Sequence, residues 1–209
     1  MLIDLNQSAL QAYFGAVCIA PIFVWHQNQQ GTLEEFNFNE MEKLSEFNSE
    51  KRKRDYVLGR IALKKALESI GYSTDTSIIS WPSPFCSLSH SDGHAIAVSS
   101  VACAGIGIDL QLNKTPPFEM ADRILSGQTL QYWHQLSDPE KAKYLQRFWT
   151  ANEAIYKACP APQPAYFRHY RLETPESLQS DAYIDNTDFH FKVYSAELSN
   201  GFVSLAVRL

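Results

Sequence analysis

The sequence lacks the patterns that mark membrane-spanning, secreted and metal-cluster proteins. No apolar run approaches the roughly 20 residues that a membrane helix needs. The first six residues lack both the basic and the long apolar segments of a signal peptide. Cys18, Cys86, Cys103 and Cys159 are scattered, without a C-x-x-C pair, so we expect four free thiols and no zinc cluster. The expected location is the cytoplasm, with no membrane partner.

The sequence also lacks an excess of positive charge. Its formal net charge is −5 over 209 residues, which argues against a nucleic-acid partner. A content of 45% hydrophobic and 12% aromatic residues fits a globular chain that is long enough for one large domain or two small ones. Positive charge is instead local, because Lys51–Arg54 are consecutive cations and Arg60 follows them. Such a run is either a solvated helix face or an anion-binding site.

What the sequence does contain is a strand, two helices and a hairpin in its first half. The strand is predicted at 14–25 and the helices at 38–47 and 49–70. Gly71 stands at the position that ends helices. The hairpin is predicted from strands at 86–90 and 95–100, joined around Asp92-Gly93.

The second half repeats this order of elements. A buried strand at 104–110 precedes helices that fill most of 119–158, the last of them beginning at Ser137-Asp138-Pro139. Strands at 166–172 and 189–198 follow, and Asn200-Gly201 turns the chain into a last strand at 202–209. The shared order hints at an internal duplication, and a ligand cleft would then lie where the repeats meet.

Two segments of the second half carry carboxylates. In Gly105–Gln111, glycines and apolar residues lead to Asp109, which either caps a turn or belongs to a site. In Trp149–Lys157, Glu153 and Lys157 are four residues apart and share one helix face. They form either a surface ion pair, worth about 0.3–0.5 kcal/mol, or part of a site beside an aromatic ring.

A third segment, Ser87–Gly93, runs from a strand into the first predicted turn. Ser89 and His90 can donate hydrogen bonds to a phosphate, and a protonated histidine adds positive charge. The alternative is that the hydroxyl and imidazole groups are satisfied locally at the turn.

Together and in this order, these segments resemble the 4′-phosphopantetheinyl transferase superfamily, specifically its two-lobed, surfactin-synthetase type. That type carries S-x-S-H, G-[IV]-D-[ILV]-E and W-[ST]-x-K-E-A-x-x-K segments. The corresponding segments here are Ser87–His90, Gly107–Gln111 and Trp149–Lys157. The arginine-rich helix that contains Tyr56–Arg60 resembles the basic helix of the family, with its L-x-G-R. The resemblance covers residues 48 to 160.

The resemblance implies an α+β fold of two pseudo-twofold-related α/β subdomains, at residues 1–103 and 104–209. Each subdomain would combine a small, mainly antiparallel sheet with a long helix, and the ligand cleft would lie between them. Members of this two-lobed type are usually monomers, so we expect a monomer.

The implied activity is transfer of the phosphopantetheine arm of coenzyme A to a serine of an apo acyl, peptidyl or aryl carrier protein. The other product would be 3′,5′-ADP, as for a holo-[acyl-carrier-protein] synthase. The partner would be a small acidic carrier protein of fatty-acid, polyketide or nonribosomal-peptide biosynthesis. Mg²⁺ is the implied cofactor, because it binds a few carboxylates together with substrate phosphates.

The resemblance also assigns roles to single residues. The implied metal ligands are Asp109, Gln111 and Glu153, and the implied catalytic residues are Asp109, Glu153 and Lys157. Glu153 would be the base for the carrier serine, and Lys157 would neutralise charge on the pyrophosphate. The implied coenzyme A-binding residues are Arg54, Arg60, Ser89, His90 and Lys157.

Several positions depart from the family pattern. Gln111 stands where members usually have a further metal-binding Glu, and Asn152 replaces the Lys before Glu153, which removes a phosphate-neutralising charge. Trp81–Pro84 takes the place of a G-K-P segment, and Thr129 lies near the place of another acid. Three interpretations remain open. The protein is an active but divergent transferase, a degenerate relative that binds coenzyme A or a carrier protein without transfer, or an unrelated α/β binding domain.

Overall fold

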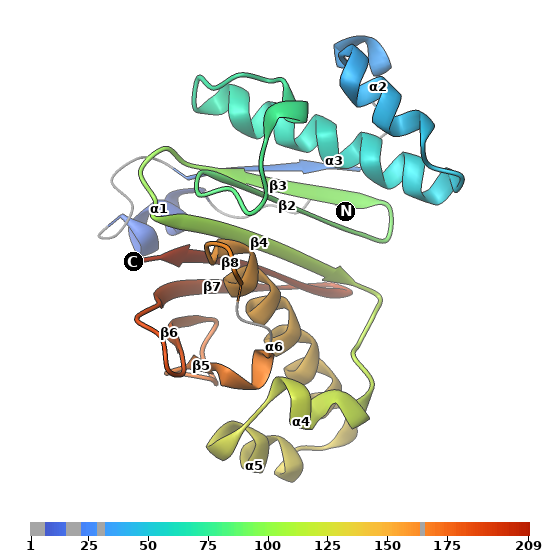
Figure 1. The fold of residues 1–209 in the computed structure, drawn as a ribbon. Helices are drawn as coiled ribbons and strands as arrows, with labels where there is room; N and C mark the ends of the chain where they lie inside the picture. The colour runs from blue at the N-terminus through green and yellow to red at the C-terminus, as the bar shows by residue number, and fades with distance from the viewer. Residues whose placement is uncertain (1–6, 16–21, 29–31, 164–165) are drawn as a thin grey trace.

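The computed structural model describes residues 7–15, 22–28, 32–163 and 166–209. It has an α+β fold with two antiparallel sheets (Figure 1). The first sheet has the strand order β1-β3-β2 and the second the order β4-β8-β7-β6-β5. Each sheet is accompanied by one long helix. The predicted fold class of two sheet-and-helix subdomains is therefore confirmed.

The first sheet and its helices come from the N-terminal part of the chain. The elements are α1 (Gln7–Phe14), β1 (Phe23–Gln27), α2 (Phe38–Ser45), α3 (Glu50–Ser69), β2 (Cys86–Ser91) and β3 (His94–Ser99). Both predicted helices are confirmed as α2 and α3. Asn37 begins α2 with a capping box, and Gly71, at φ +68°, follows α3. The predicted hairpin is confirmed as β2–β3, with its turn at Asp92 and Gly93 in the left-handed region.

The second sheet and the remaining helices follow. They are β4 (Gly105–Leu112), α4 (Ala121–Ile124), α5 (Gly127–Gln135), α6 (Asp138–Ala158), β5 (Tyr170–Leu172), β6 (Gln179–Ile184), β7 (His190–Leu198) and β8 (Gly201–Arg208). A capping box between Ser137 and Glu140 begins α6, as the sequence predicts. Within the described residues, no helix combines the length and the apolar composition that crossing a bilayer requires.

The two long helices cover opposite sides of the paired sheets (Figure 1). Helix α3 packs on the first sheet and α6 on β4 and β8 of the second. Between the sheets lies one shared core, in which Ile96 of β3 and Ile108 of β4 pack with Leu10 and Phe14 of α1. The boundary predicted between residues 103 and 104 falls in the connection from β3 to β4. Strands β2 and β4, one from each half, lie side by side where the sheets meet.

Two predicted strands are partly wrong, and one observed strand is not predicted. In the segment 14–25, Phe14 ends helix α1 instead, residues 16–21 lie outside the described residues, and β1 begins at Phe23. Leu10 and Phe14 are both buried and four residues apart, which is the spacing of a helix face. In the segment 166–172, residues 167–169 form a 3₁₀ helix and only the last three residues form β5. Strand β6 escapes prediction because two of its buried residues, Ser180 and Ala182, are small.

The prediction of four free thiols is wrong at Cys103, which forms a disulfide bond. Cys86 and Cys159 are free and buried, and Cys18 lies outside the described residues. The spacing of cysteines along the chain does not show which of them meet in the fold. Because disulfides are rare in reducing compartments, the cysteines no longer support the expected cytoplasmic location.

Candidate functional site

Two glycines of β4 allow helix α6 to lie directly on the strand. A Cβ atom at Gly105 would stand 2.2 Å from the carbonyl oxygen of Ala158, and one at Gly107 would stand 2.0 Å from that of Ala154. Only glycine fits such a close approach. Because side chains alternate along a strand, Asp109 is the next residue of β4 that faces α6. The G-I-G-I-D pattern thus brings one carboxylate against the helix.

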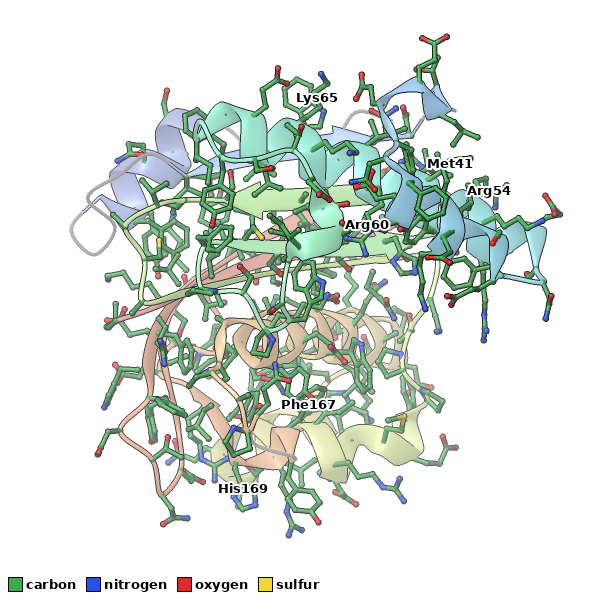
Figure 2. The ribbon with its side chains drawn as sticks, turned by 45° about the horizontal axis from the view of Figure 1, so that its top comes forward. Met41, Arg54, Arg60, Lys65, Phe167 and His169 are labelled. Carbon is green, nitrogen blue, oxygen red and sulfur yellow. The ribbon has the colours of Figure 1, made fainter. Side chains whose placement is uncertain are left out.

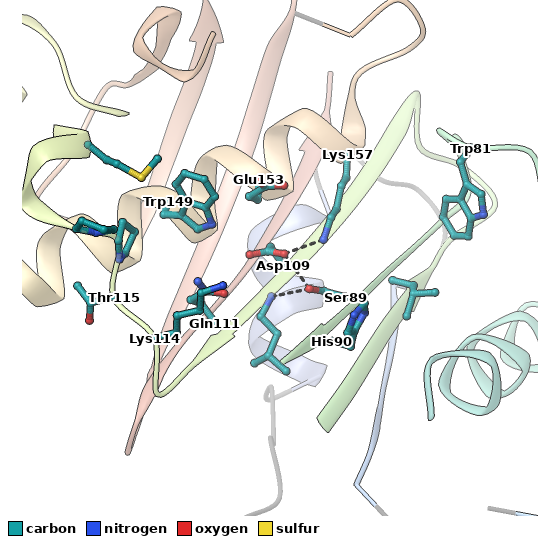
Figure 3. Close-up of a pocket in the computed structure, with 15 residues that line it drawn as sticks. Trp81, Ser89, His90, Asp109, Gln111, Lys114, Thr115, Trp149, Glu153 and Lys157 are labelled. Carbon is teal, nitrogen blue, oxygen red and sulfur yellow. Dashed lines mark hydrogen bonds and ion pairs between the residues drawn. The ribbon is translucent and has the colours of Figure 1, made fainter. Parts of the chain in front are cut away.

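Helix α6 places Glu153 and Lys157 in the same cavity as Asp109 (Figure 3). This cavity has a volume of about 620 Å³, and β2 and β4 from the two halves both contribute to its lining. Six of the predicted site residues lie in it: Ser89, His90, Asp109, Gln111, Glu153 and Lys157. Six residues that the sequence analysis names as candidates therefore come together in one cavity, although they are far apart along the chain.

The Asp109 carboxylate is buried, with 6% of the residue exposed, and two donors hold one of its oxygens. Ser89 Oγ donates to Asp109 Oδ1 at 2.8 Å, and Lys157 Nζ donates to the same oxygen at 2.7 Å. Lys157 Nζ also donates to the carbonyl oxygen of Ile108 at 3.0 Å. Among the described residues, no donor contacts Asp109 Oδ2. That second oxygen is available to a ligand.

The Glu153 carboxylate has no hydrogen-bond partner among the described residues, although the side chain is half-buried. Burial raises the pKa of Glu153, and the negative charge of Asp109 raises it further, while Lys157 lowers it. Lys157 is paired with Asp109, so the charge of Glu153 is left for a further cation or a proton to balance.

These groups fit a hard divalent cation. Asp109 Oδ2 and the Glu153 carboxylate are oxygen groups without a hydrogen-bond donor among the described residues, and Gln111 lines the same cavity. Mg²⁺ is commonly bound by one or two carboxylates, with substrate phosphates and water completing its shell. Within the described residues, no group of three or more His, Cys, Asp or Glu side chains is arranged to hold a metal. The protein therefore fits Mg²⁺ only if the substrate supplies further oxygens.

The predicted phosphate-binding residues are divided between two places. His90 lines the cavity. Arg54 instead lines a separate surface pocket formed with residues of α2 and α3, and Arg60 donates to the carbonyl oxygen of Thr76 at 3.2 Å. Figure 2 shows both arginines on the side of the molecule formed by α2 and α3, with Phe167 on the opposite side. The basic run thus does not join the cavity that holds Asp109.

One departure from the family pattern has a structural explanation. Asn152 is 1% exposed, does not line the cavity, and donates to the carbonyl oxygen of Ile124 at 3.4 Å. The Asn152 side chain therefore packs against α4 and does not face the cavity. Gln111, in contrast, does line the cavity.

Sequence reasoning missed Lys114 and Trp81, which both line the cavity. Lys114 follows β4 and is an exposed cation in the lining. The aromatic ring of Trp81 forms part of the walls together with Trp149, which the sequence already places beside Glu153. Trp81 belongs to the segment that replaces G-K-P. Lys114 carried only a weak signal in the sequence, because it stands alone before two prolines rather than in a motif.

A family model described as the 4′-phosphopantetheinyl transferase superfamily matches residues 105–206. The matched segment begins with β4 and ends within β8, so it contains Asp109, Gln111, Glu153 and Lys157. A comparison with curated proteins gives no match. The cavity and the matched segment agree, and residues 105–206 form a segment of the 4′-phosphopantetheinyl transferase superfamily.

Proposed function

We propose that this protein transfers the 4′-phosphopantetheine group of coenzyme A to a serine of an apo carrier protein and releases 3′,5′-ADP. Phosphopantetheinyl transfer is the activity of the superfamily. The observation that carries the proposal for this chain is its pair of carboxylates. Asp109 Oδ2 and Glu153 face one cavity without hydrogen-bond donors among the described residues, and Lys157 lies beside them. A substrate with several phosphates and a cation would complete this arrangement.

The charges of the cavity suit the substrate. Mg²⁺ held by Asp109, Glu153 and the carbonyl of Gln111 would polarise the reacting phosphate and stabilise the departing 3′,5′-ADP. Lys157, which is fixed against Asp109, adds positive charge beside the pyrophosphate. Lys114 and His90 line the same cavity and are proposed to bind the remaining phosphate oxygens. Arg54 and Arg60 have no part in this proposal.

Glu153 is the proposed base. The hydroxyl oxygen of the carrier serine forms a bond to the β-phosphorus of coenzyme A, and its proton passes to the Glu153 carboxylate. The bond from that phosphorus to the oxygen shared with the α-phosphate breaks, and 3′,5′-ADP leaves with the electron pair. The Glu153 carboxylate lines the cavity and has no hydrogen-bond donor among the described residues, so it is open to that proton.

The finer assignments remain proposals. The two sheet-and-helix subdomains support the two-lobed, surfactin-synthetase type, with a holo-[acyl-carrier-protein] synthase reaction. Acyl, peptidyl and aryl carrier proteins are all candidate partners, and a monomer is the proposed state. Division of the chain at residues 103 and 104 is proposed because the connection from β3 to β4 joins the two sheets.

A second candidate is a relative that binds coenzyme A or a carrier protein without transfer. The observation that favours it is Gln111, which lines the cavity where a third carboxylate is usual in the family. A neutral carbonyl holds Mg²⁺ more weakly than a carboxylate does, because it contributes no net charge.

The test is incubation with coenzyme A, Mg²⁺ and a panel of apo acyl, peptidyl and aryl carrier proteins, followed by intact mass measurement. We expect one carrier class to gain the phosphopantetheine mass, and the variants Asp109→Asn and Glu153→Gln to give no gain. Glu197→Gln, which changes an exposed acid paired with Lys143, is the matched control and should transfer normally. Thermal stabilisation by coenzyme A without any mass gain would select the second candidate.

A further inference from the structure

Serine hydroxyls join strand β2 to strand β4. The two strands belong to different sheets, yet the backbone N–H groups of β4 donate to side chains of β2. Ser87 Oγ accepts from Ile108 at 3.1 Å, Ser89 Oγ from Leu110 at 3.1 Å and Ser91 Oγ from Leu112 at 2.9 Å. These three bonds form a hydroxyl ladder between the two halves of the molecule.

The hydroxyl ladder has a regular register. Each pair of residues is separated by 21 positions along the chain, so the two strands run parallel and stay in step. Every second residue of a strand points the same way. This explains why the serines at 87, 89 and 91 all accept from backbone N–H groups along the same edge of β4. The serines satisfy amide groups of β4 that would otherwise be buried without acceptors.

Ser89 differs from the other two serines because it also contacts the site. Its Oγ accepts from the Leu110 N–H and donates to Asp109 Oδ1 at 2.8 Å. A hydroxyl has one proton and two lone pairs. The proton of Ser89 is therefore committed to Asp109, and it cannot be given to a phosphate without releasing that carboxylate.

The result is a fixed orientation of the Asp109 side chain. Oδ1 takes one hydrogen bond from β2 and one from Lys157 of α6, while Oδ2 has no donor among the described residues. The Leu110 N–H donates to the Ser89 hydroxyl, and that hydroxyl donates to the Asp109 carboxylate. The backbone of β4 therefore helps to orient the Asp109 side chain.

We propose that Ser89 is a positioning residue for Asp109, not a ligand of coenzyme A, and that the hydroxyl ladder sets its place. This proposal rests on the proposed transfer reaction for its kinetic consequences. It replaces the phosphate-binding role that the family resemblance implied for Ser89.

The test compares Ser89→Ala with Ser87→Ala. Both serines are buried, with 5% and 2% of the residue exposed, and each variant removes one rung of the hydroxyl ladder. Only Ser89 touches Asp109. A Ser89→Thr variant, which keeps the hydroxyl, is the rescue. Transfer is measured with coenzyme A and with 3′-dephospho-coenzyme A, and crystal structures of the three variants show the Asp109 side chain.

We expect Ser89→Ala to lower kcat by about 10- to 100-fold, the usual effect of losing a group that orients a metal ligand. Ser87→Ala should leave kcat within about threefold, and Ser89→Thr should recover activity. The preference of Ser89→Ala for coenzyme A over its 3′-dephospho form should equal that of the wild type. Its crystal structure should show Asp109 turned or disordered, with β4 in place.

Two results would overturn the positioning role. One is a loss of the preference for the 3′-phosphate in Ser89→Ala, which would make Ser89 a phosphate ligand. The other is an unchanged Asp109 orientation in the Ser89→Ala crystal structure. The orientation of Asp109 in the crystal structure does not depend on activity. If the wild-type protein transferred nothing, the proposed function would be refuted, but the crystal structure of Ser89→Ala would still test the positioning role.

Discussion

At the scale of single residues, the sequence predicted which groups meet but not what each one does. Asp109, Glu153 and Lys157 were brought together only by the family resemblance, because strand and helix periods alone left each of them open to a purely structural role. The role of Ser89 could not be predicted, because its hydroxyl proton can be donated to several acceptors. The observed acceptor, Asp109, lies 20 positions away in the sequence and on another strand. Arg54 and Arg60 lie outside this cavity, which the sequence could not indicate because a run of cations shows charge without direction.

Lys114 is the residue whose contribution only the structure suggests. It is exposed, lines the cavity and forms no ion pair among the described residues, so we expect it to bind a phosphate of coenzyme A. Because a hydrogen bond to a charged group is worth roughly 1.5–3 kcal/mol, Lys114→Ala should raise the KM for coenzyme A by about 10- to 100-fold. Steady-state kinetics at saturating carrier protein would measure this change.

Lys65→Ala is the control for this variant. Lys65 is a lysine of α3 that pairs with Glu68 at 3.2 Å and does not line the cavity. Equal KM values for the two variants would show that Lys114 takes no part in binding.

At the scale of elements, the sequence predicts best where local pattern and tertiary packing agree. Helix α3 has a regular apolar period and a glycine at its end, and it was predicted almost to the residue. Helix α1 was missed because a helix of eight residues depends on packing in the shared core for its stability, and the local sequence does not show that packing. The contact of β4 with α6 could be predicted only in part. The glycines of G-I-G-I-D indicate that another element packs closely on the strand, but they do not indicate which helix it is.

That contact gives a prediction for Gly107. A Cβ atom there would stand 2.0 Å from the Ala154 carbonyl oxygen and 2.7 Å from the Ala158 backbone nitrogen, so helix or strand must shift. We expect Gly107→Ala to lower the free energy of unfolding by about 3 kcal/mol, at the upper end for overpacked cores. It should also abolish transfer, because Asp109 and Glu153 would separate. Urea unfolding and the mass assay measure the two effects.

The comparison is Ile108→Val, a change on the opposite face of the same strand. Ile108 packs in the shared core, and removing one methyl group there costs about 0.5–1.5 kcal/mol without moving α6. If Gly107→Ala were as active and as stable as Ile108→Val, the close contact of β4 with α6 would not be required for the site.

At the scale of the whole molecule, a buried ion pair links the outer helix α2 to helix α3. Glu40 Oε2 lies 2.8 Å from Lys64 Nζ, and the two side chains are 0% and 5% exposed. The other oxygen of Glu40 accepts from the backbone N–H of Thr76 at 3.1 Å. The loop after α3 is held as well, because Lys64 donates to the carbonyl oxygen of Thr74 at 2.9 Å.

This pair makes the stability of the molecule depend on pH. Burial raises the pKa of Glu40, but hydrogen bonds from Lys64, Thr76 and the Asn37 backbone outweigh it, so the pKa lies below its ordinary value of 4.5. In acid the unfolded chain therefore binds a proton at Glu40 before the folded protein does. The stabilisation is complete above about pH 4.5 and is lost as the pH falls through the lower folded-state pKa.

We therefore expect Glu40→Gln to have a large effect at neutral pH and a smaller one in acid. At pH 7 the variant leaves Lys64 buried without its counter-charge, which typically costs about 3–5 kcal/mol. Below about pH 4.5 the wild type loses part of the same stabilisation, so the two curves of unfolding free energy against pH should converge. Urea unfolding between neutral and acidic pH measures both curves, with Glu197→Gln at an exposed pair expected to change stability by less than about 1 kcal/mol. Curves for Glu40→Gln and the wild type that stay parallel into acid would show that another group governs the acid sensitivity of this fold.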